Sequence, residues 1–375
     1  MYPHQVSGIL YPLLKKFLPR TTNPLFLCKR LHKMSLTVTI ADIAKKLNTT
    51  SATVSRALNN HPAISDKTKK AVLQTAEKLN YRRNKIASSL RSGQTGIIGV
   101  IIPSAEINFF GSVVHGIESM ANQHGYNVLI YQSNESWEHE QKGIETFLNA
   151  RVDGIMASIA KQTNDYTHFL NARDAKMPIV FFDRANDDLE IDSVVIDDHK
   201  AAYIATQHLI DQGYSRIAHI SGPQHIKIFK ARLKGYKDAL KANDMAFDPK
   251  LVFIGDVSIA AGRFAIEYFL KLPNPPDAAF AVEDFTALGA IKELKQNNIY
   301  VPDDFGIIGF ANESFGEHIT PSLSTIDQQT VKMGKEAFSL MLKLIEEKAN
   351  GKHVMQKKIL EPIPVFRNSS LRKKL

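Results

Sequence analysis

The stretch VTIADIAKKLNTTSATVSRALN, residues 38–59, decides the fold of the first part of the chain. Apolar residues recur at a period near 3.6 on both sides of a polar break, as in an amphipathic helix. The two apolar faces comprise Ile40, Ile43, Ala44 and Leu47, then Val54, Ala57 and Leu58. Asn48 lies between them, and asparagine tolerates the left-handed backbone that a tight helix-turn-helix connection needs. The stretch therefore predicts two short helices of the kind that bind DNA.

Hydroxyl side chains predict where three helices begin. Thr39 and Thr50 precede the two helices, and each can accept a hydrogen bond from an unpaired amide of the first turn. Ser65 has the same place before a third helical segment. The residues of this segment that are expected to close a three-helix core are Ile64, Val72, Leu73, Ala76 and Leu79. We therefore expect a helix-turn-helix DNA-binding domain over residues 36–81.

The formal charge of +9 is unevenly distributed along the 375 residues. Residues 1–35 hold six Lys/Arg and no Asp/Glu, and residues 36–95 hold eleven Lys/Arg and three Asp/Glu. The rest of the chain has a net charge of −5. A basic end on a mildly acidic body is typical of a protein that contacts phosphate with one end only. A solvated basic surface is the alternative, and the adjacent helix-turn-helix pattern favours nucleic acid.

Residues 1–35 contain prolines and no acidic residue, and their apolar patches are short. We expect this segment to be a disordered extension or a start-site artefact, because Met34 directly precedes the helix-turn-helix. A disordered basic arm that adds nonspecific affinity for DNA is the alternative.

Residues 82–95 form a predicted hinge or linker. Ile86, Ala87 and Leu90 fall at helical spacing, but the segment is too short and too polar to be a stable helix alone. Two such segments, paired in a dimer on DNA, can fold and insert apolar side chains into the minor groove. A flexible tether is the alternative.

From residue 96 the pattern changes to short apolar runs separated by helical stretches, which predicts parallel sheets covered by helices on both faces. The runs are GIIGVIIPS, GYNVLIYQS, VDGIMASIA, MPIVFFDRA, SVVIDD, RIAHISGP, DAAFAVED and FGIIGFAN. This is too much sequence for one ordinary sheet, so residues 96–370 predict an α/β domain of two lobes. STIDQ, residues 324–328, is expected to return between the lobes. Ligands of such sheets bind at the carboxyl ends of the strands.

Several residues at these predicted strand ends suit a sugar-like ligand, whose hydroxyls pair with charged groups and whose ring faces pack on aromatic side chains. Phe109 and Phe110 follow the first strand, and Asp183 and Arg184 end the fourth. Arg232 lies in ARLKGY, and Asp284 ends AFAVED. A phenylalanine pair is more often part of a core and a strand-end aspartate is often a helix cap, so each residue alone is a weak signal.

Residues 38–59, the Ser65 helix and the segment from Asn84 to Leu90 resemble the head of the LacI/GalR (lactose-repressor) family of bacterial transcription regulators. The resemblance extends from about Val38 to Arg367. It implies a dimer on a palindromic operator, with the helix-turn-helix in the major groove and the hinge helix in the minor groove. It also implies a periplasmic-binding-protein-like effector domain.

The resemblance assigns roles to individual residues. It implies base-edge contacts for Ser51, Ala52 and Arg56, because arginine pairs well with the two acceptors of guanine. The residues implied to contact phosphate or to position the head are Thr39, Thr50, Thr53, Ser55 and Asn59. The implied hinge contacts are Asn84, Ala87 and the intercalating Leu90. The implied effector contacts are Phe109, Phe110, Asp183, Arg232, Asp284 and Asn312.

Three positions depart from the family pattern. Arg83 stands where proline is common at the start of the hinge, Glu283 where asparagine is common, and Ala311 where an effector-binding aspartate is common. Asn312 or Glu313 is the expected substitute for that aspartate. The departures suggest a ligand other than the family's commonest kind.

No sequence signature of catalysis accompanies these features. The chain contains no phosphate-binding loop, GxSxG or HExxH motif and no metal-ligand spacing of cysteine and histidine. Cys28 is the single cysteine, and no apolar run reaches the roughly 18 residues that span a membrane. We therefore expect a cytoplasmic transcriptional repressor without enzymatic activity, cofactor or metal, controlled by a small molecule such as a sugar derivative. A sugar-binding transport protein and a regulator controlled by a partner protein are the alternatives.

Overall fold

The computed structural model describes residues 38–81, 94–350 and 354–372. The chain divides into two compact units at residues 87 and 88, and each unit is described by itself. The first contains the head, and the second, the effector unit, contains two lobes.

The head consists of three helices that begin at the predicted caps. They are α3 (Ile40–Lys46), α4 (Ser51–Leu58) and α5 (Asp66–Lys78). The Thr50 hydroxyl accepts from the Thr53 amide at 3.1 Å, and the Ser65 hydroxyl accepts from the Thr68 amide at 3.3 Å. Thr39 forms a capping box with Asp42, since each side chain accepts from the other residue's amide. The three cap predictions are confirmed.

The core of the head is small and follows the predicted apolar faces with one exception. Its fully buried members are Ile43, Ala44, Val54, Ala57, Val72 and Ala76. Leu73 was expected in this core and is 55% exposed, so that prediction is wrong. Val72 and Ala76, four residues apart on α5, face the other two helices, and Leu73 is turned away by about 100° along the helix.

Asn48 has the predicted left-handed backbone, with φ of 51°, and follows Leu47, the C-cap of α3. We expect Asn48→Ala to destabilise the turn by about 1 kcal/mol, because a β-carbon without a polar side chain disfavours this region. Asn48→Gly is the matched control and should cost nothing, since glycine populates the region freely. Hydrogen exchange of the α3 and α4 amides measures the stability of the turn in both variants. Equal protection in the two variants would contradict the expectation.

Lobe 1 of the effector unit is a six-stranded parallel sheet with the order β2-β1-β3-β4-β5-β11. Its strands are β1 (Ile97–Ile102), β2 (Asn127–Gln132), β3 (Gly154–Ala157), β4 (Ile179–Phe182), β5 (Asp192–Ile196) and β11 (Lys357–Leu360). Its helices are α7 (Asn108–Gln123), α8 (Trp137–Ala150), α9 (Thr167–Asp174), α14 (Thr330–Asn350) and the short η1 (Asp187–Leu189).

Lobe 2 is a four-stranded parallel sheet with the order β7-β6-β8-β9, next to an antiparallel pair of β10 and β12. Its strands are β6 (Ile217–Ser221), β7 (Val252–Ile254), β8 (Ala278–Ala281), β9 (Gly306–Ile308), β10 (Thr325–Asp327) and β12 (Ile363–Val365). Its helices are α10 (Asp198–Asp211), α11 (Lys227–Ala242), α12 (Ile259–Leu270), α13 (Asp284–Gln296) and the short η2 (Pro249–Leu251) and η3 (Ser314–Glu317).

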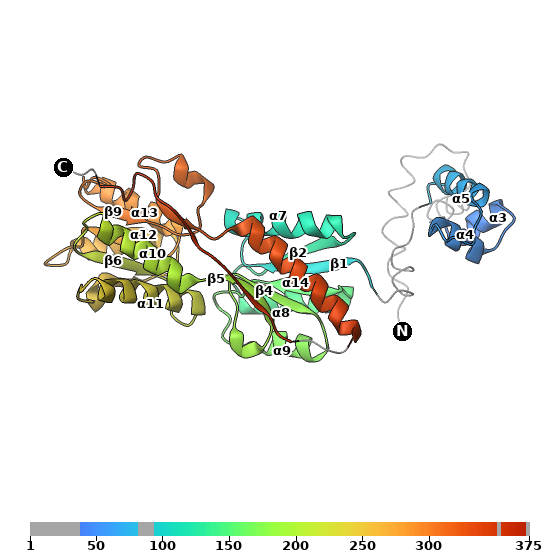
Figure 1. The fold of residues 1–375 in the computed structure, drawn as a ribbon, viewed down its shortest axis with the longest axis horizontal. Coiled ribbons are helices and arrows are strands. Elements are labelled where there is room, and N and C mark those ends of the chain that lie inside the picture. The colour runs from blue at the N-terminus through green and yellow to red at the C-terminus, as the bar shows by residue number, and fades with distance from the viewer. Residues whose placement is uncertain (1–37, 82–93, 351–353, 373–375) are drawn as a thin grey trace, which may run out of the picture. The chain divides into compact units, whose positions relative to one another are not determined.

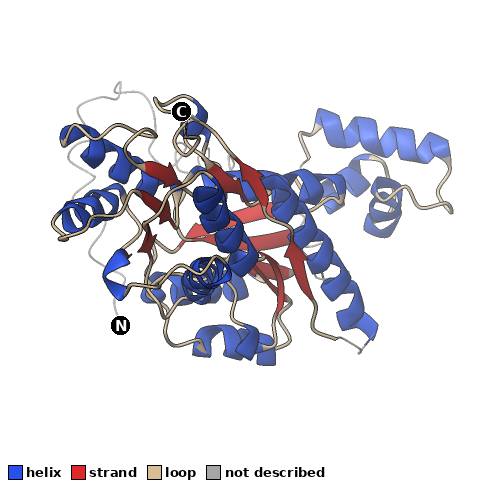
Figure 2. Cartoon of the chain, turned by 60° about the vertical axis from the view of Figure 1, so that its left-hand side comes forward, coloured by secondary structure: helices blue, strands red, loops and turns tan. Residues whose placement is uncertain are grey.

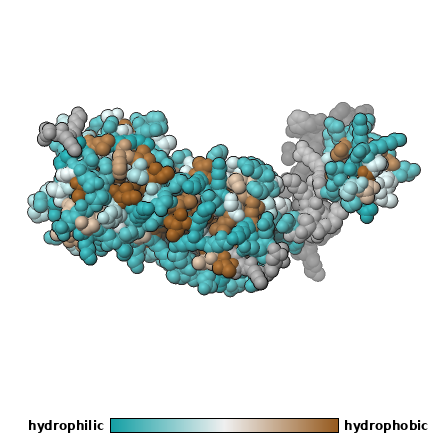
Figure 3. All heavy atoms as spheres, in the orientation of Figure 1, coloured by the Kyte–Doolittle hydropathy of each residue, from teal (hydrophilic) through white to brown (hydrophobic). Residues whose placement is uncertain are grey.

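Helices cover both faces of each parallel sheet, as Figure 2 shows. Successive residues of β1 pack on opposite faces of the sheet. Val100 lies in the cluster with Phe338 of α14, and Ile101 lies in the cluster with Phe147 of α8. Because both faces are buried, the strands are continuous apolar runs without alternation. On the face drawn in Figure 3, the remaining hydrophobic residues form scattered patches among hydrophilic ones.

The chain passes between the lobes three times within the described segments: from β5 to α10, from β10 to α14 and from β11 to β12 (Figure 1). The predicted return, residues 324–328, consists mainly of strand β10 of lobe 2 and ends at Gln328, where this second passage begins. The predicted two-lobed α/β fold is confirmed. The strands β7, β11 and β12 had no counterpart among the predicted runs. No helix in the described segments has the length and apolarity needed to cross a bilayer.

Candidate functional site

The head presents most of the predicted DNA contacts on its surface. The side chains of Thr39, Thr50, Ser51, Ala52, Arg56 and Asn59 are exposed, and Thr53 is half-buried. Ser51, Ala52 and Arg56 lie on the same helix, α4, with Arg56 one turn after Ala52. Ser55 is only 9% exposed, because it lies on the buried side of α4 between Val54 and Ala57, so it is poorly placed to contact DNA. The predicted hinge contacts Asn84, Ala87 and Leu90 lie outside the described residues.

The effector unit contains a cavity of about 310 Å³ that is lined by both lobes. We call it the interlobe cavity. Its lining residues from lobe 1 are Glu106, Ile107, Phe109, Phe110, Glu135, Lys161, Asp183 and Arg184. From lobe 2 and the passage after β10 they are Ile228, Phe229, Arg232, Val257, Ser258, Ile259, Glu283, Phe285, Ala311 and Gln328. Four of the six predicted effector residues, Phe109, Phe110, Asp183 and Arg232, are therefore brought together.

The carboxyl ends of the parallel strands place the polar groups of this cavity. Asp183 and Arg184 directly follow β4, and Glu283 follows β8. Phe109 and Phe110 begin α7 after β1 and pack edge-to-face, with ring centroids 5.0 Å apart. Strand ends of parallel sheets meet at one edge, so residues far apart in sequence line one space.

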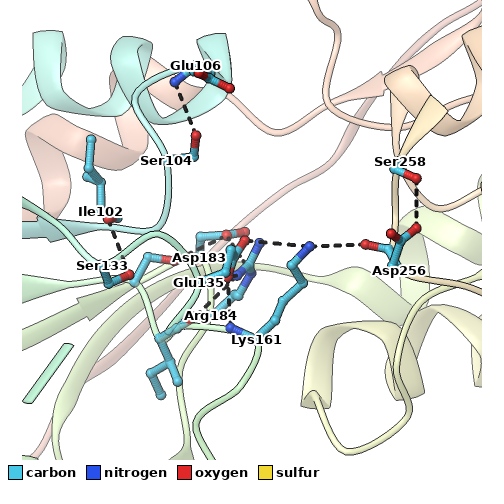
Figure 4. Close-up of polar contacts among 12 residues, drawn as sticks. Ile102, Ser104, Glu106, Ser133, Glu135, Lys161, Asp183, Arg184, Asp256 and Ser258 are labelled. Atoms are coloured by element: carbon cyan, nitrogen blue, oxygen red, sulfur yellow. Dashed lines mark hydrogen bonds and ion pairs between the residues drawn. The ribbon is translucent and has the colours of Figure 1, made fainter. Parts of the chain in front are cut away.

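Glu135 is the hub of the polar network on the lobe 1 side (Figure 4). Its carboxylate accepts from the Arg184 guanidinium at 2.7 Å and from the Lys161 amide at 2.8 Å. Burial acts to raise the pKa of Glu135, but the charges of Arg184 and Lys161 outweigh burial, so the pKa is lowered. The Glu135 carboxylate is therefore charged and holds Arg184 in place.

Lys161 links the two lobes. Its ammonium group donates to the Asp256 carbonyl of lobe 2 at 3.0 Å and lies 3.8 Å from the Glu135 carboxylate of lobe 1 (Figure 4). Its own carbonyl is 2.7 Å from the His225 ring of lobe 2. These contacts hold the lobes together around the cavity.

Asp183 combines burial with an unusual backbone. It is 6% exposed and has φ of 60°, a left-handed conformation that is uncommon for residues other than glycine and costs conformational energy. The Ser158 hydroxyl is 3.4 Å from its carboxylate. Burial raises the pKa of Asp183, and the neighbouring Arg184 and Arg232 oppose this only in part. Strain and a desolvated carboxyl at a cavity wall are typical of a binding group.

Arg232 is held rigidly beneath the cavity. It donates to the Asp198 carboxylate at 2.7 Å and to the Val282 carbonyl at 2.6 Å. Its guanidinium lies 3.5 Å from the centroid of the Phe310 ring, a cation–π contact. Burial raises the pKa of Asp198 to about 6 despite the opposing charge of Arg232.

Asp284 and Asn312, the other two predicted effector residues, do not line the interlobe cavity. Asp284 is fully buried, and its carboxylate accepts from the Glu313 amide at 2.7 Å and the Thr325 hydroxyl at 2.8 Å. Asn312 donates to Asp327 at 3.2 Å and accepts from the Arg367 guanidinium at 3.0 Å. Both side chains thus join segments of lobe 2 to each other.

The structure adds cavity residues that sequence reasoning did not select as effector contacts: Glu106, Glu135, Lys161, Arg184, Glu283 and Gln328. Arg184 was noted at a strand end and Glu283 as a departure from the family pattern, and Lys161 directly follows the third predicted run, so their positions carried a signal. Gln328 ends residues 324–328, the predicted return between the lobes, whereas Glu135 had no signal because a loop brings it in. The described residues contain no group of three or more His, Cys, Asp or Glu arranged to hold a metal ion.

Comparison with known proteins decides the family. Residues 39–84 match the model of bacterial regulatory proteins of the lacI family, and residues 95–366 match the model of periplasmic binding proteins and the sugar binding domain of the LacI family. The chain belongs to the LacI family. The match over the head separates it from transport proteins that share only the second domain, and members of this family are transcriptional regulators.

Similar LacI-family relatives cover almost the whole chain. The transcriptional repressor CytR of Escherichia coli (strain K12) is 33% identical over 331 residues, 86% of this chain and 93% of that protein. Catabolite control protein A of Priestia megaterium is 32% identical over 322 residues, 86% of this chain and 96% of that protein. The lac repressor dimer bound to operator and an anti-inducer superimposes with a TM-score of 0.80 at 25% identity, covering 90% of this chain and 100% of that chain.

Proposed function

We propose that this LacI-family regulator is a repressor that binds a palindromic operator as a homodimer and responds to a sugar or sugar derivative in the interlobe cavity. The observation that carries the proposal is the cavity itself, in which charged side chains and an aromatic pair from both lobes converge. A solved structure of the regulator CelR in complex with cellobiose has the same architecture, with a TM-score of 0.66 and 26% identity, covering 88% of this chain and 99% of that chain.

The coupling between cavity and head follows from the contacts between the lobes. Phe109 donates its amide to the Glu313 carboxylate at 3.0 Å, and Lys227 lies 3.0 Å from the Asp188 carboxylate. A ligand that bridges the lobes changes the balance of such contacts, and with it the separation of the two hinge segments of a dimer. An effector that favours separated hinges induces, and one that favours adjacent hinges corepresses.

The homodimer has support in the surface of lobe 1. The edge strand β2 exposes Leu129 and Ile130 to 41% and 50%. A long apolar edge strand left in water invites pairing and is usually covered. The lac repressor structure is a dimer bound to operator. We propose that a second copy of this chain covers the β2 side of lobe 1.

Arg56→Ala tests the operator contact. We expect a loss of about 1 to 3 kcal/mol in binding free energy on the operator and a relaxed preference at one base position, because an exposed arginine on α4 can pair with guanine. Fluorescence anisotropy with operator and with random duplexes measures both. Lys70→Ala, an exposed cation on α5, is the control and should weaken both duplexes equally. An equal loss on both duplexes for Arg56→Ala would show that Arg56 contacts phosphate.

A further inference from the structure

The interlobe cavity contains buried acceptor atoms without a hydrogen-bond partner. One carboxylate oxygen of Glu283, Oε1, is buried and unpartnered. The other, Oε2, caps α13 by accepting from the amides of Phe285 at 2.8 Å and Thr286 at 3.3 Å. The amide oxygen of Gln328 is also unpartnered, and that side chain is only 4% exposed. One oxygen of Glu135, Oε1, is likewise without a hydrogen bond, although it lies 3.8 Å from the Lys161 ammonium. An unmade hydrogen bond at a buried polar atom is costly, so three such atoms among the lining residues indicate a ligand that satisfies them.

The cations of the same cavity are already engaged. Lys161 donates to the Asp256 carbonyl, Arg184 to Glu135 and Arg232 to Asp198. Arg184 Nε is the one atom of these groups that lacks a hydrogen bond among the lining residues, and it lies 3.9 Å from the Asp183 carboxylate. The unused capacity of the cavity therefore lies mainly in acceptors, and the partner it lacks is a donor.

We propose that the effector carries a basic nitrogen, as an amino group on a sugar-sized ring, and that Glu283 binds this group. The inference rests on the proposed effector function of the interlobe cavity and names the chemical class of the ligand. An ammonium group neutralises a buried carboxylate and satisfies its free oxygen at once. A neutral hydroxyl brings no charge that could hold the carboxyl in its ionised form, so the cavity should discriminate between an amine and a hydroxyl at this position.

The surroundings of Glu283 explain why the position is open without ligand. Burial, with the nearby carboxyls of Asp284 and Glu313, raises its pKa to about 8, although the amides of Thr286 and Phe285 oppose this. At neutral pH the carboxyl therefore keeps its proton in the empty cavity. A bound ammonium displaces that proton to solvent and takes its place as the positive partner.

The first test compares matched pairs of sugars on the full chain: glucosamine with glucose, galactosamine with galactose, and mannosamine with mannose. We expect at least one amine to raise the melting temperature and to bind roughly tenfold or more tightly than its hydroxyl partner. Glu283→Gln should abolish this preference. Glu118→Gln, an exposed position on α7 outside the cavity, is the control and should retain it. A neutral sugar that binds as tightly as its amine, a preserved preference in Glu283→Gln, or no stabilisation by any of the three amines would overturn the inference.

The second test needs no ligand. The folded-state pKa of Glu283 lies above its unfolded value of 4.5, so its contribution to stability is lost as the pH rises toward 8. We expect Glu283→Gln to melt above the wild type at pH 8, with a smaller difference at pH 6, while Glu118→Gln follows the wild type. A variant that melts well below the wild type at pH 8 would show that the fold itself needs the carboxylate, and would overturn the inference.

The two proposals fail in different ways. If a neutral sugar occupies the cavity and changes operator affinity, the effector function stands and the amine assignment falls. If compounds bind the cavity and operator affinity in an anisotropy assay never changes, the effector function falls.

Discussion

Arg232→Ala is expected to destabilise the effector unit by about 3 to 5 kcal/mol and to abolish the effector response, while the head retains its own affinity for DNA. The change leaves the Asp198 carboxylate buried without its cation, and it removes the donor to the Val282 carbonyl. It also removes the cation above the Phe310 ring. Urea denaturation of the full chain measures the stability, and anisotropy on operator with and without the effector measures the response.

A matched control and a second variant keep this expectation testable. Lys234→Ala, on the same helix α11, removes an exposed pair with Asp238 and should cost less than about 1 kcal/mol. Combining Arg232→Ala with Asp198→Asn removes the orphaned charge, so part of the lost stability should return without the effector response. An unchanged response in either Arg232 variant would remove Arg232 from the effector site.

Asp284→Ala is expected to destabilise lobe 2 by about 2 to 6 kcal/mol, because two buried donors lose their acceptor at once. These donors are the Glu313 amide and the Thr325 hydroxyl, which arrive from two different segments of lobe 2. Gly309 makes room for this carboxylate, since a β-carbon there would lie 2.2 Å from the Asp284 oxygen. The measurement is thermal and urea unfolding of the full chain.

Asp284→Asn separates this structural role from direct effector contact. The amide keeps one acceptor oxygen, so the variant should lose only part of the stability and its effector affinity should fall little. If Asp284→Asn instead unfolds like the wild type but loses effector affinity, Asp284 contacts the ligand, as the family resemblance implies. Asp303→Asn, the same change at an exposed position of lobe 2, is the control and should leave both the stability and the effector affinity unchanged.

The parts of the site that could be predicted from the sequence are those that follow directly from strand order. Asp183 ends a continuous apolar run and Phe109 follows another, and parallel strands bring their carboxyl ends to one edge. The same argument selected Asp284, which also ends such a run. Asp284 does not line the cavity, because position along a strand does not say toward which neighbour a side chain turns.

The contacts that decide these directions join residues far apart in the chain. Asn312 is held by Arg367, 55 residues later, and the Glu135 partner of Arg184 lies 49 residues earlier. Neither pairing leaves a local pattern. The strands β11 and β12 escaped prediction for a related reason: each is short, and β12 has a proline and a partner, β10, that is distant in sequence.

The sequence by itself determined the head almost completely: the periodic faces, the hydroxyl caps and Asn48 are local signals, and each depends on residues within about one turn of helix. It also determined the alternation of strand and helix, because buried parallel strands are continuous apolar runs. Only the tertiary structure decided which polar side chains face the interlobe cavity and which form hydrogen bonds within a lobe. Asp284 and Asn312 form hydrogen bonds with other residues of lobe 2. One oxygen of Glu283 has no such partner, which is why we propose that a ligand binds it.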